Sequence, residues 1–201
     1  AIALGYTTQG RSQQLTYVLA PLVGWWAVRL WREGRLPRWW LVLPLTVVWA
    51  NYHGGWVLLP IMLVAAALAR VVERGVRDRV SWQALLLALG CGLAAMVSPV
   101  GPANAFTALT FSRAASSQIA EWERVALWSD QGWQLGAVLL VAVLCWVFGR
   151  SRPRRGEVLL VLLLVAFGFL AYRNITPTIL MLAPLLAGTM ARALPEPAPT
   201  S

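Results

Sequence analysis

The chain has 201 residues, of which 59% are hydrophobic and 12% are charged, and its mean hydropathy is +0.64. Soluble domains carry about 25% charged residues, so this composition excludes an ordinary water-soluble protein. The net charge of +9 does not indicate nucleic-acid binding, because the arginines separate apolar segments instead of forming one solvated stripe. The chain is predicted to be an integral membrane protein whose partners include membrane lipid and no nucleic acid.

Seven apolar segments are the candidate membrane helices, since a helix needs about 20 apolar residues to cross a bilayer and fewer when arginines flank it. They cover residues 13–30, 39–51, 55–72, 82–98, 131–149, 157–172 and 175–192. The predicted fold class is therefore all-α, a polytopic transmembrane helix bundle over residues 1–194. An outer loop is expected at 99–130 and a disordered tail at 195–201. The spans themselves are predicted to carry no charge.

The segment at 39–51 is short, so it either spans a thinned region of bilayer or enters and returns as a hairpin. Loop arginines favour the first alternative, because cytoplasmic loops hold the excess of basic residues. Seven crossings leave four of the 17 arginines outside, Arg11, Arg113, Arg124 and Arg173. The N-terminus is therefore predicted outside and the C-terminus inside. The absence of lysine, with abundant Ala, Gly and Leu, indicates a bacterial cytoplasmic membrane.

This topology places the least easily explained polar residues on the outer face, where ionisable groups are costly unless they are paired or used. His53 is the single histidine. Glu121 and Glu123 flank an indole, and the two acids could bind a cationic group, position a metal-bound phosphate or orient an acceptor hydroxyl. Arg173 suits a phosphate, because a guanidinium binds two phosphate oxygens at once. The candidate catalytic residues are His53, Glu121 and Glu123. The candidate substrate-binding residues are Arg173, Asn51 and Asn174.

Each of these residues also has a purely structural interpretation. His53 could be a hydrogen-bonded turn residue, and Glu121 and Glu123 a solvated loop anchored by a tryptophan. Arg173 could be held in an ion pair with Glu121, Glu123 or Asp130. The stretch 98–113 could be a helix stop followed by an interfacial anchor. No metal site and no cofactor are predicted, and a divalent cation beside the two glutamates has no further support in the sequence.

Five short motifs follow one another along the chain: RSQQLTY at 11–17, WANYHGG at 49–55, SPVG at 98–101, EW at 121–122 and RN at 173–174. Their order resembles a family of uncharacterised bacterial polytopic membrane proteins, which is similar to the GT-C membrane glycosyltransferases that use polyprenyl-phosphate-linked sugars. The third motif departs from the family pattern, which more usually begins Asn-Pro followed by an aromatic residue. Roles at Ser98 and Val100 are therefore not carried over.

The resemblance implies a membrane module that transfers a sugar from a lipid-phosphate donor at the outer face. GT-C enzymes are similar in placing an acidic catalytic residue in their first outer loop, near the start of the chain. This chain is expected to begin after that loop, as a fragment without the N-terminal part. What the resemblance then leaves is the donor-lipid side of the site, with Arg173 on the phosphate and His53 and Glu121 lining the aqueous entrance.

Two other functions compete with this one. A transporter or flippase-like protein would carry ionisable residues in mid-membrane and helices broken at repeated positions. Prolines do occur within the segments, at Pro21, Pro44, Pro60 and Pro184. A non-enzymatic membrane subunit is the third hypothesis, and the incomplete set of acidic residues is its main support.

Overall fold

The computed structural model describes residues 13–104, 120–149 and 152–193, and these ranges are helical without any strand. The α-helices are α2 (Gln13–Glu33), α3 (Trp39–Tyr52), α4 (Leu58–Arg74), α5 (Arg79–Ala94), α7 (Asp130–Phe148), α8 (Arg155–Phe169) and α9 (Ile175–Ala193). Short 3-10 helices are η1 (Gly54–Val57), η2 (Ala120–Trp122) and η3 (Tyr172–Asn174). The predicted all-α class is confirmed. The tail at 195–201 and part of the loop at 99–130 lie outside the described residues.

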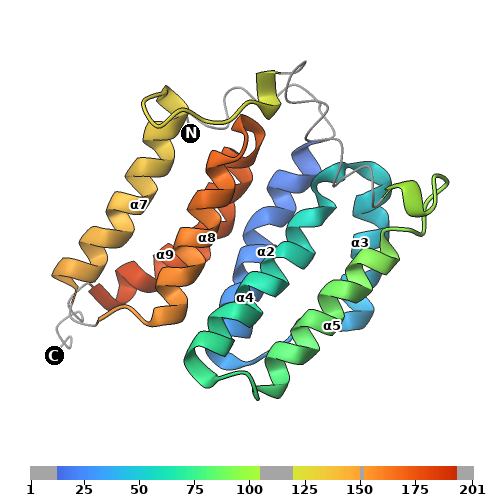
Figure 1. Ribbon diagram of the computed structural model, residues 1–201, viewed down its shortest axis with the longest axis horizontal. Helices are drawn as coiled ribbons and strands as arrows, with labels where there is room; N and C mark the ends of the chain where they lie inside the picture. Colours follow the sequence, from blue (N-terminus) through green and yellow to red (C-terminus); the bar gives the residue numbers. More distant parts are fainter. Residues whose placement is uncertain (1–12, 105–119, 150–151, 194–201) are drawn as a thin grey trace, which may run out of the picture.

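The helices stand side by side, with α7 at one edge of the bundle and α3 and α5 at the other (Figure 1). Between these edges α2 packs on α4 and α9, while α4 also packs on α5 and α8. The chain alternates in direction from helix to helix along α2, α3, α4 and α5 (Figure 1). The bundle therefore has two distinct ends.

One end, called here the arginine-rich end, is formed by the last turns of α2, α4 and α9 and the first turns of α3, α5 and α8. The other, called the histidine end, is formed by the start of α2, the turn at 53–55, residues 95–104, and η2 and η3 with their flanking turns. Twelve of the fourteen arginines in the described ranges belong to the arginine-rich end, and the histidine end holds Arg124 and Arg173. The contacts described below between α2, α4, α5, α8 and α9 confirm this grouping.

Glycine allows the closest helix contact in the bundle. A Cβ atom at Gly24 of α2 would lie 2.2 Å from the carbonyl oxygen of Met181 in α9. Only a residue without a side chain lets these two backbones approach so closely. Around this contact the core is apolar, with Ala20, Leu30, Trp31, Leu182 and Leu185 each at most 1% exposed.

Three helical stretches of the described chain are long and apolar enough to cross a membrane: Gly54–Arg74, Asp130–Phe148 and Tyr172–Ala193. Helix α7 exposes apolar side chains along its length, among them Leu140, Val147 and Phe148. Such surface is costly in water and suits contact with lipid. Together these features indicate a membrane protein.

Residues 39–51 lie in one continuous helix, α3, which runs parallel to α5, with Leu43 beside Gly90 and Asn51 bonded to the carbonyl of Val97. Helix α3 joins the arginine-rich end to the histidine end without turning back. That it crosses the bilayer stays a prediction.

The prediction that the spans carry no charge is wrong. Glu157 in α8 is fully buried, Arg70 in α4 is 5% exposed, and Arg29 lies in the last turns of α2. These residues lie close enough to a helix end for partners from neighbouring ends to reach them. Arg70 shows how, since its guanidinium bonds both oxygens of Asp78, at 2.8 and 2.9 Å. Its Nη1 also donates to the carbonyls of Leu30 and Trp31, both at 3.1 Å, at the end of α2.

Candidate functional site

Three of the predicted site residues meet at the histidine end, although they are far apart in sequence. Nη2 of Arg173 in η3 lies 3.4 Å from Nε2 of His53, which occupies the turn after α3. Glu121 in η2 lies near the same group: burial lowers the pKa of Arg173, and the negative charge of Glu121 opposes that shift. The amide nitrogen of Gln13 donates to the carboxylate of Glu121 at 3.3 Å. Gln13 is in turn bonded by the hydroxyl of Tyr17 at 2.9 Å.

The turn around His53 fixes the orientation of its imidazole ring. His53 follows the last residue of α3 and directly precedes η1, and its Nδ1 accepts a hydrogen bond from the backbone N–H of Gly55 at 3.0 Å. The hydroxyl of Thr16 lies 2.9 Å from the same nitrogen. Trp49 donates its indole N–H to that hydroxyl at 3.1 Å, which leaves the Thr16 proton directed to Nδ1.

These contacts determine the tautomer of His53. A backbone N–H can only donate, so Nδ1 of His53 must be the unprotonated nitrogen and Nε2 carries the proton of the neutral ring. Burial lowers the pKa of His53 below its ordinary value, and the positive charge of Arg173 lowers this pKa further. The neutral ring with its proton on Nε2 is therefore the form that this site favours at neutral pH.

The contact between His53 and Arg173 consequently brings two donors together. The Nε2–H of His53 and the guanidinium N–H groups of Arg173 both need an acceptor, yet their nitrogens are only 3.4 Å apart. Arg173 itself is held in place by stacking on the indole of Trp122, with its central carbon 4.1 Å from the ring centroid. Within the described chain, Nε2 of His53 has no other hydrogen-bond partner. An acceptor oxygen beside both groups would satisfy both donors.

The other predicted site residues, Asn51, Asn174 and Glu123, form hydrogen bonds that involve the backbone. The side-chain amide of Asn51 donates to the carbonyls of Val47 and Val97, both at 2.8 Å, and so ties α3 to the end of α5. The amide of Asn174 donates to the carbonyl of Phe167 at 3.1 Å. Glu123 is exposed, and its backbone carbonyl accepts from the N–H of Tyr172 at 3.1 Å, which joins the segment after η2 to η3.

The residues that hold the site together lie in the motifs at 11–17, 49–55 and 121–122, but the sequence alone provides no reason to assign them these roles. Thr16 and Trp49 fix the imidazole, Trp122 supports the guanidinium, and Gln13 connects Glu121 to α2. One signal was present, since polar residues gather in the first turns of α2 in a segment that otherwise reads as a membrane helix. Polar side chains in such a position need partners, and the neighbouring turn supplies them.

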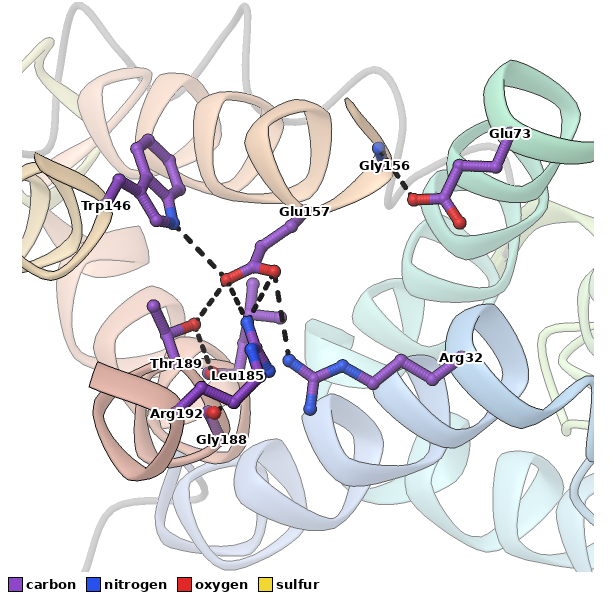
Figure 2. Close-up of polar contacts among 9 residues, drawn as sticks. All are labelled: Arg32, Glu73, Trp146, Gly156, Glu157, Leu185, Gly188, Thr189 and Arg192. Atoms are coloured by element: carbon purple, nitrogen blue, oxygen red, sulfur yellow. Dashed lines mark hydrogen bonds and ion pairs between the residues drawn. The ribbon is translucent and has the colours of Figure 1, made fainter. Parts of the chain in front are cut away.

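A second polar cluster, at the arginine-rich end, surrounds Glu157 (Figure 2). Nη2 of Arg192 donates to its two carboxylate oxygens at 2.7 and 2.6 Å, and the hydroxyl of Thr189 donates to one of them at 2.5 Å. The indole of Trp146 adds a fourth bond at 3.3 Å, and Arg32 forms an ion pair at 3.9 Å. The four hydrogen bonds satisfy the carboxylate of Glu157, whereas Nη2 of Arg32 is buried without a hydrogen-bond partner among the described residues and contacts it by charge alone.

No group of three or more His, Cys, Asp or Glu side chains in the described ranges could hold a metal ion. The two cysteines are unpaired thiols, Cys91 in the core and Cys145 partly buried. Comparison with known proteins gives no further assignment, because no protein-family model, curated protein or solved structure matches the chain.

Proposed function

We propose that the chain is the multi-pass module of a GT-C-like glycosyltransferase of the bacterial inner membrane, and that it binds the phosphate of a lipid-linked sugar donor. The observation that carries this proposal is the pair of opposed donors, Nε2–H of His53 and the guanidinium of Arg173. A phosphate oxygen accepts from both, and hydrogen bonds to a charged acceptor are about twice as strong as neutral ones.

Topology supports a phosphate site on the outer face. Seven crossings with the N-terminus outside put the arginine-rich end in the cytoplasm, where positively charged loops are retained. The histidine end then lies at the outer surface, at the depth where the phosphate of a polyprenyl lipid meets water. The pair of His53 and Arg173 is only partly buried, and it lies at η1 and η3 on that side of the bundle.

The geometry also assigns roles within the site. His53 already carries its proton on Nε2, and its Nδ1 is occupied by the N–H of Gly55, so His53 acts here as a hydrogen-bond donor and not as a base. Arg173 supplies the positive charge for the phosphate. Among the carboxylates of the described chain, Glu121 is the one associated with this pair. We assign it the role of orienting the acceptor hydroxyl.

A transporter has less support than an enzyme. The charged residues of the described helices lie in the terminal turns, and none occupies the middle of a helix. A substrate pathway through the bilayer would place ionisable groups there. A non-enzymatic subunit that binds the same lipid phosphate is the alternative that the site geometry also fits.

Binding of polyprenyl phosphate to the full-length protein in nanodiscs tests the proposal. Arg173→Ala should weaken binding roughly tenfold or more, because hydrogen bonds to charged groups contribute about 1.5–3 kcal/mol. His53→Leu should weaken it as well, whereas His53→Gln keeps an N–H donor near the position of Nε2 and should retain more affinity. Arg124→Ala is the matched control, since Arg124 is an exposed arginine at the same end.

Equal affinity in Arg173→Ala and Arg124→Ala would overturn the phosphate site. A sugar-transfer assay on the same preparations separates the two remaining functions. Transfer that falls with binding supports the glycosyltransferase, while binding without any transfer in the full-length protein supports the non-enzymatic subunit.

A further inference from the structure

The outer surface of α3 has an apolar groove at the arginine-rich end, away from the phosphate site. Its lining side chains repeat at helical spacing along one face of the helix: Trp39, Trp40, Leu43, Pro44, Val47 and Val48. Several of them are strongly exposed, with Trp39 at 66%, Trp40 at 55% and Val48 at 63%. The groove is open along its length, so it suits a flexible hydrocarbon chain.

An arginine stands at the mouth of this groove. Arg38 directly precedes α3, and its guanidinium lies 5.6 Å from the ring centroid of Trp40. Arg38 has no acidic partner among the described residues. The first turn of α3 adds backbone N–H groups and the positive end of the helix dipole at the same place.

The acids of this end are already used by other partners. Glu33 pairs with Arg29 and Arg35, at 3.3 and 3.2 Å, and Asp78 pairs with Arg70 at 2.8 Å. Glu157 is held by Arg192 at 2.6 Å. The neighbouring Glu73 accepts the backbone N–H of Gly156 at 3.1 Å. The positive charge at the groove mouth is therefore not neutralised from within the described chain.

We propose that an anionic phospholipid binds along α3, with its phosphate at Arg38 and the exposed indoles of Trp39 and Trp40, and with one acyl chain in the groove. One molecule then satisfies both the unneutralised arginine and the exposed apolar face. A zwitterionic lipid fits less well, because its own cationic group opposes the surrounding arginines. The site is independent of the proposed function, since it lies at the opposite end of the bundle.

Native mass spectrometry of the full-length protein tests this site, using nanodiscs that contain equal amounts of phosphatidylglycerol and phosphatidylcholine. The wild-type protein should retain phosphatidylglycerol preferentially. Arg38→Ala should lower its retention about fivefold, the contribution expected of one basic residue near an anionic membrane surface. Arg38→Lys should keep much of the preference because it preserves the charge.

Two further variants distinguish the contribution of the positive charge to lipid retention from that of the apolar groove. Val48→Ser, at an exposed position on the apolar face, should lower the retention of both lipids without changing their ratio. Arg124→Ala removes an exposed arginine from the histidine end and should change neither. Thermal unfolding of each variant establishes that it is folded.

Equal retention of the two lipids by the wild-type protein would overturn the proposal, as would identical behaviour of Arg38→Ala and Arg124→Ala. Added inorganic phosphate distinguishes a lipid site from a general anion site. Excess phosphate should leave phosphatidylglycerol bound, because it cannot replace the acyl chain. Displacement by phosphate alone would contradict the role of the groove.

Discussion

The two ends of the bundle each hold a polar cluster centred on one ionisable side chain, and the clusters differ in how their hydrogen bonds are matched. At the arginine-rich end, the carboxylate of Glu157 accepts from Arg192, Thr189 and Trp146, with Arg32 close by. At the histidine end, Nε2–H of His53 faces the guanidinium of Arg173, donor against donor. The carboxylate of Glu157 is therefore satisfied within the protein, whereas the two donors of the histidine end need an acceptor from outside the pair.

Of the substitutions that test this difference between the two ends, Glu157→Gln should have the largest effect on stability. The substitution leaves the positive charges of Arg192 and Arg32 beside a buried neutral amide. Breaking a buried ion pair in this way costs about 3–5 kcal/mol, and the lower figure applies here because the side chain of Arg192 is 37% exposed and can turn toward water. The free energy of unfolding in a detergent titration should fall accordingly, while polyprenyl phosphate binding by the folded fraction is unchanged.

Glu33→Gln is the control for that prediction. Glu33 also belongs to the arginine-rich end and pairs with two arginines, but its side chain is 44% exposed. Exposed pairs contribute about 0–1 kcal/mol, so its loss should be small. If both substitutions destabilised the protein to a similar extent, the burial of Glu157 would not make its ion pairs more important than those of the exposed Glu33.

A smaller effect is expected from Gly55→Ala at the histidine end. An added Cβ would lie 2.2 Å from Oγ1 of Thr16 and 2.9 Å from Nδ1 of His53, so the imidazole must move. Overpacking of this kind costs about 1–3 kcal/mol. Unlike Glu157→Gln, this substitution should weaken polyprenyl phosphate binding, because it displaces a donor of the site.

The neighbouring glycine provides a matched control. A Cβ at Gly54 would meet nothing within 4 Å, so Gly54→Ala should preserve both stability and binding. If Gly54→Ala and Gly55→Ala behaved alike, the position of the imidazole would not depend on the contact with Thr16.

The smallest effect concerns pH. The pKa of His53 is lowered in the folded protein, so the unfolded chain binds a proton more readily than the folded chain does. Stability should therefore be greatest above pH 6.5, the ordinary pKa of the side chain, and should decline as the pH falls below it. Thermal unfolding between pH 7.5 and 5.5 measures this decline, and His53→Gln should reduce it. An unchanged decline in that variant would assign the effect to other groups.

Much of the fold was predictable from hydropathy, since each predicted segment coincides with one of the α-helices described. His53, Glu121 and Arg173 lie at one end of the bundle, and their place on the outer face stays a prediction. The seven crossings and their orientation stay predictions. Hydropathy could not predict the buried charge of Glu157. One acid in the strongly apolar segment 157–172 barely changes the mean hydropathy of that segment.

The roles of the amides were likewise out of reach of the sequence. Asn51 and Asn174 have the polarity of substrate-binding residues, but each lies near a helix end, within reach of carbonyls of its own and neighbouring segments. Their side chains donate to those carbonyls. Thr16 and Trp49 contact each other across 33 positions of sequence, and only the packing of α2 on the turn after α3 brings them together.

Arg70 has a consequence for how this chain is inserted into a bilayer. In the proposed topology it is one of the basic residues that keep a loop on the cytoplasmic side, and its guanidinium also joins the end of α2 to the start of α5. The direction of insertion depends on the positive charge, whereas this contact between helices depends on the planar set of guanidinium donors. The two requirements act at different times, the first during synthesis and the second after the helices have assembled. Arg70→Lys would therefore leave the direction of insertion intact and loosen the assembled bundle.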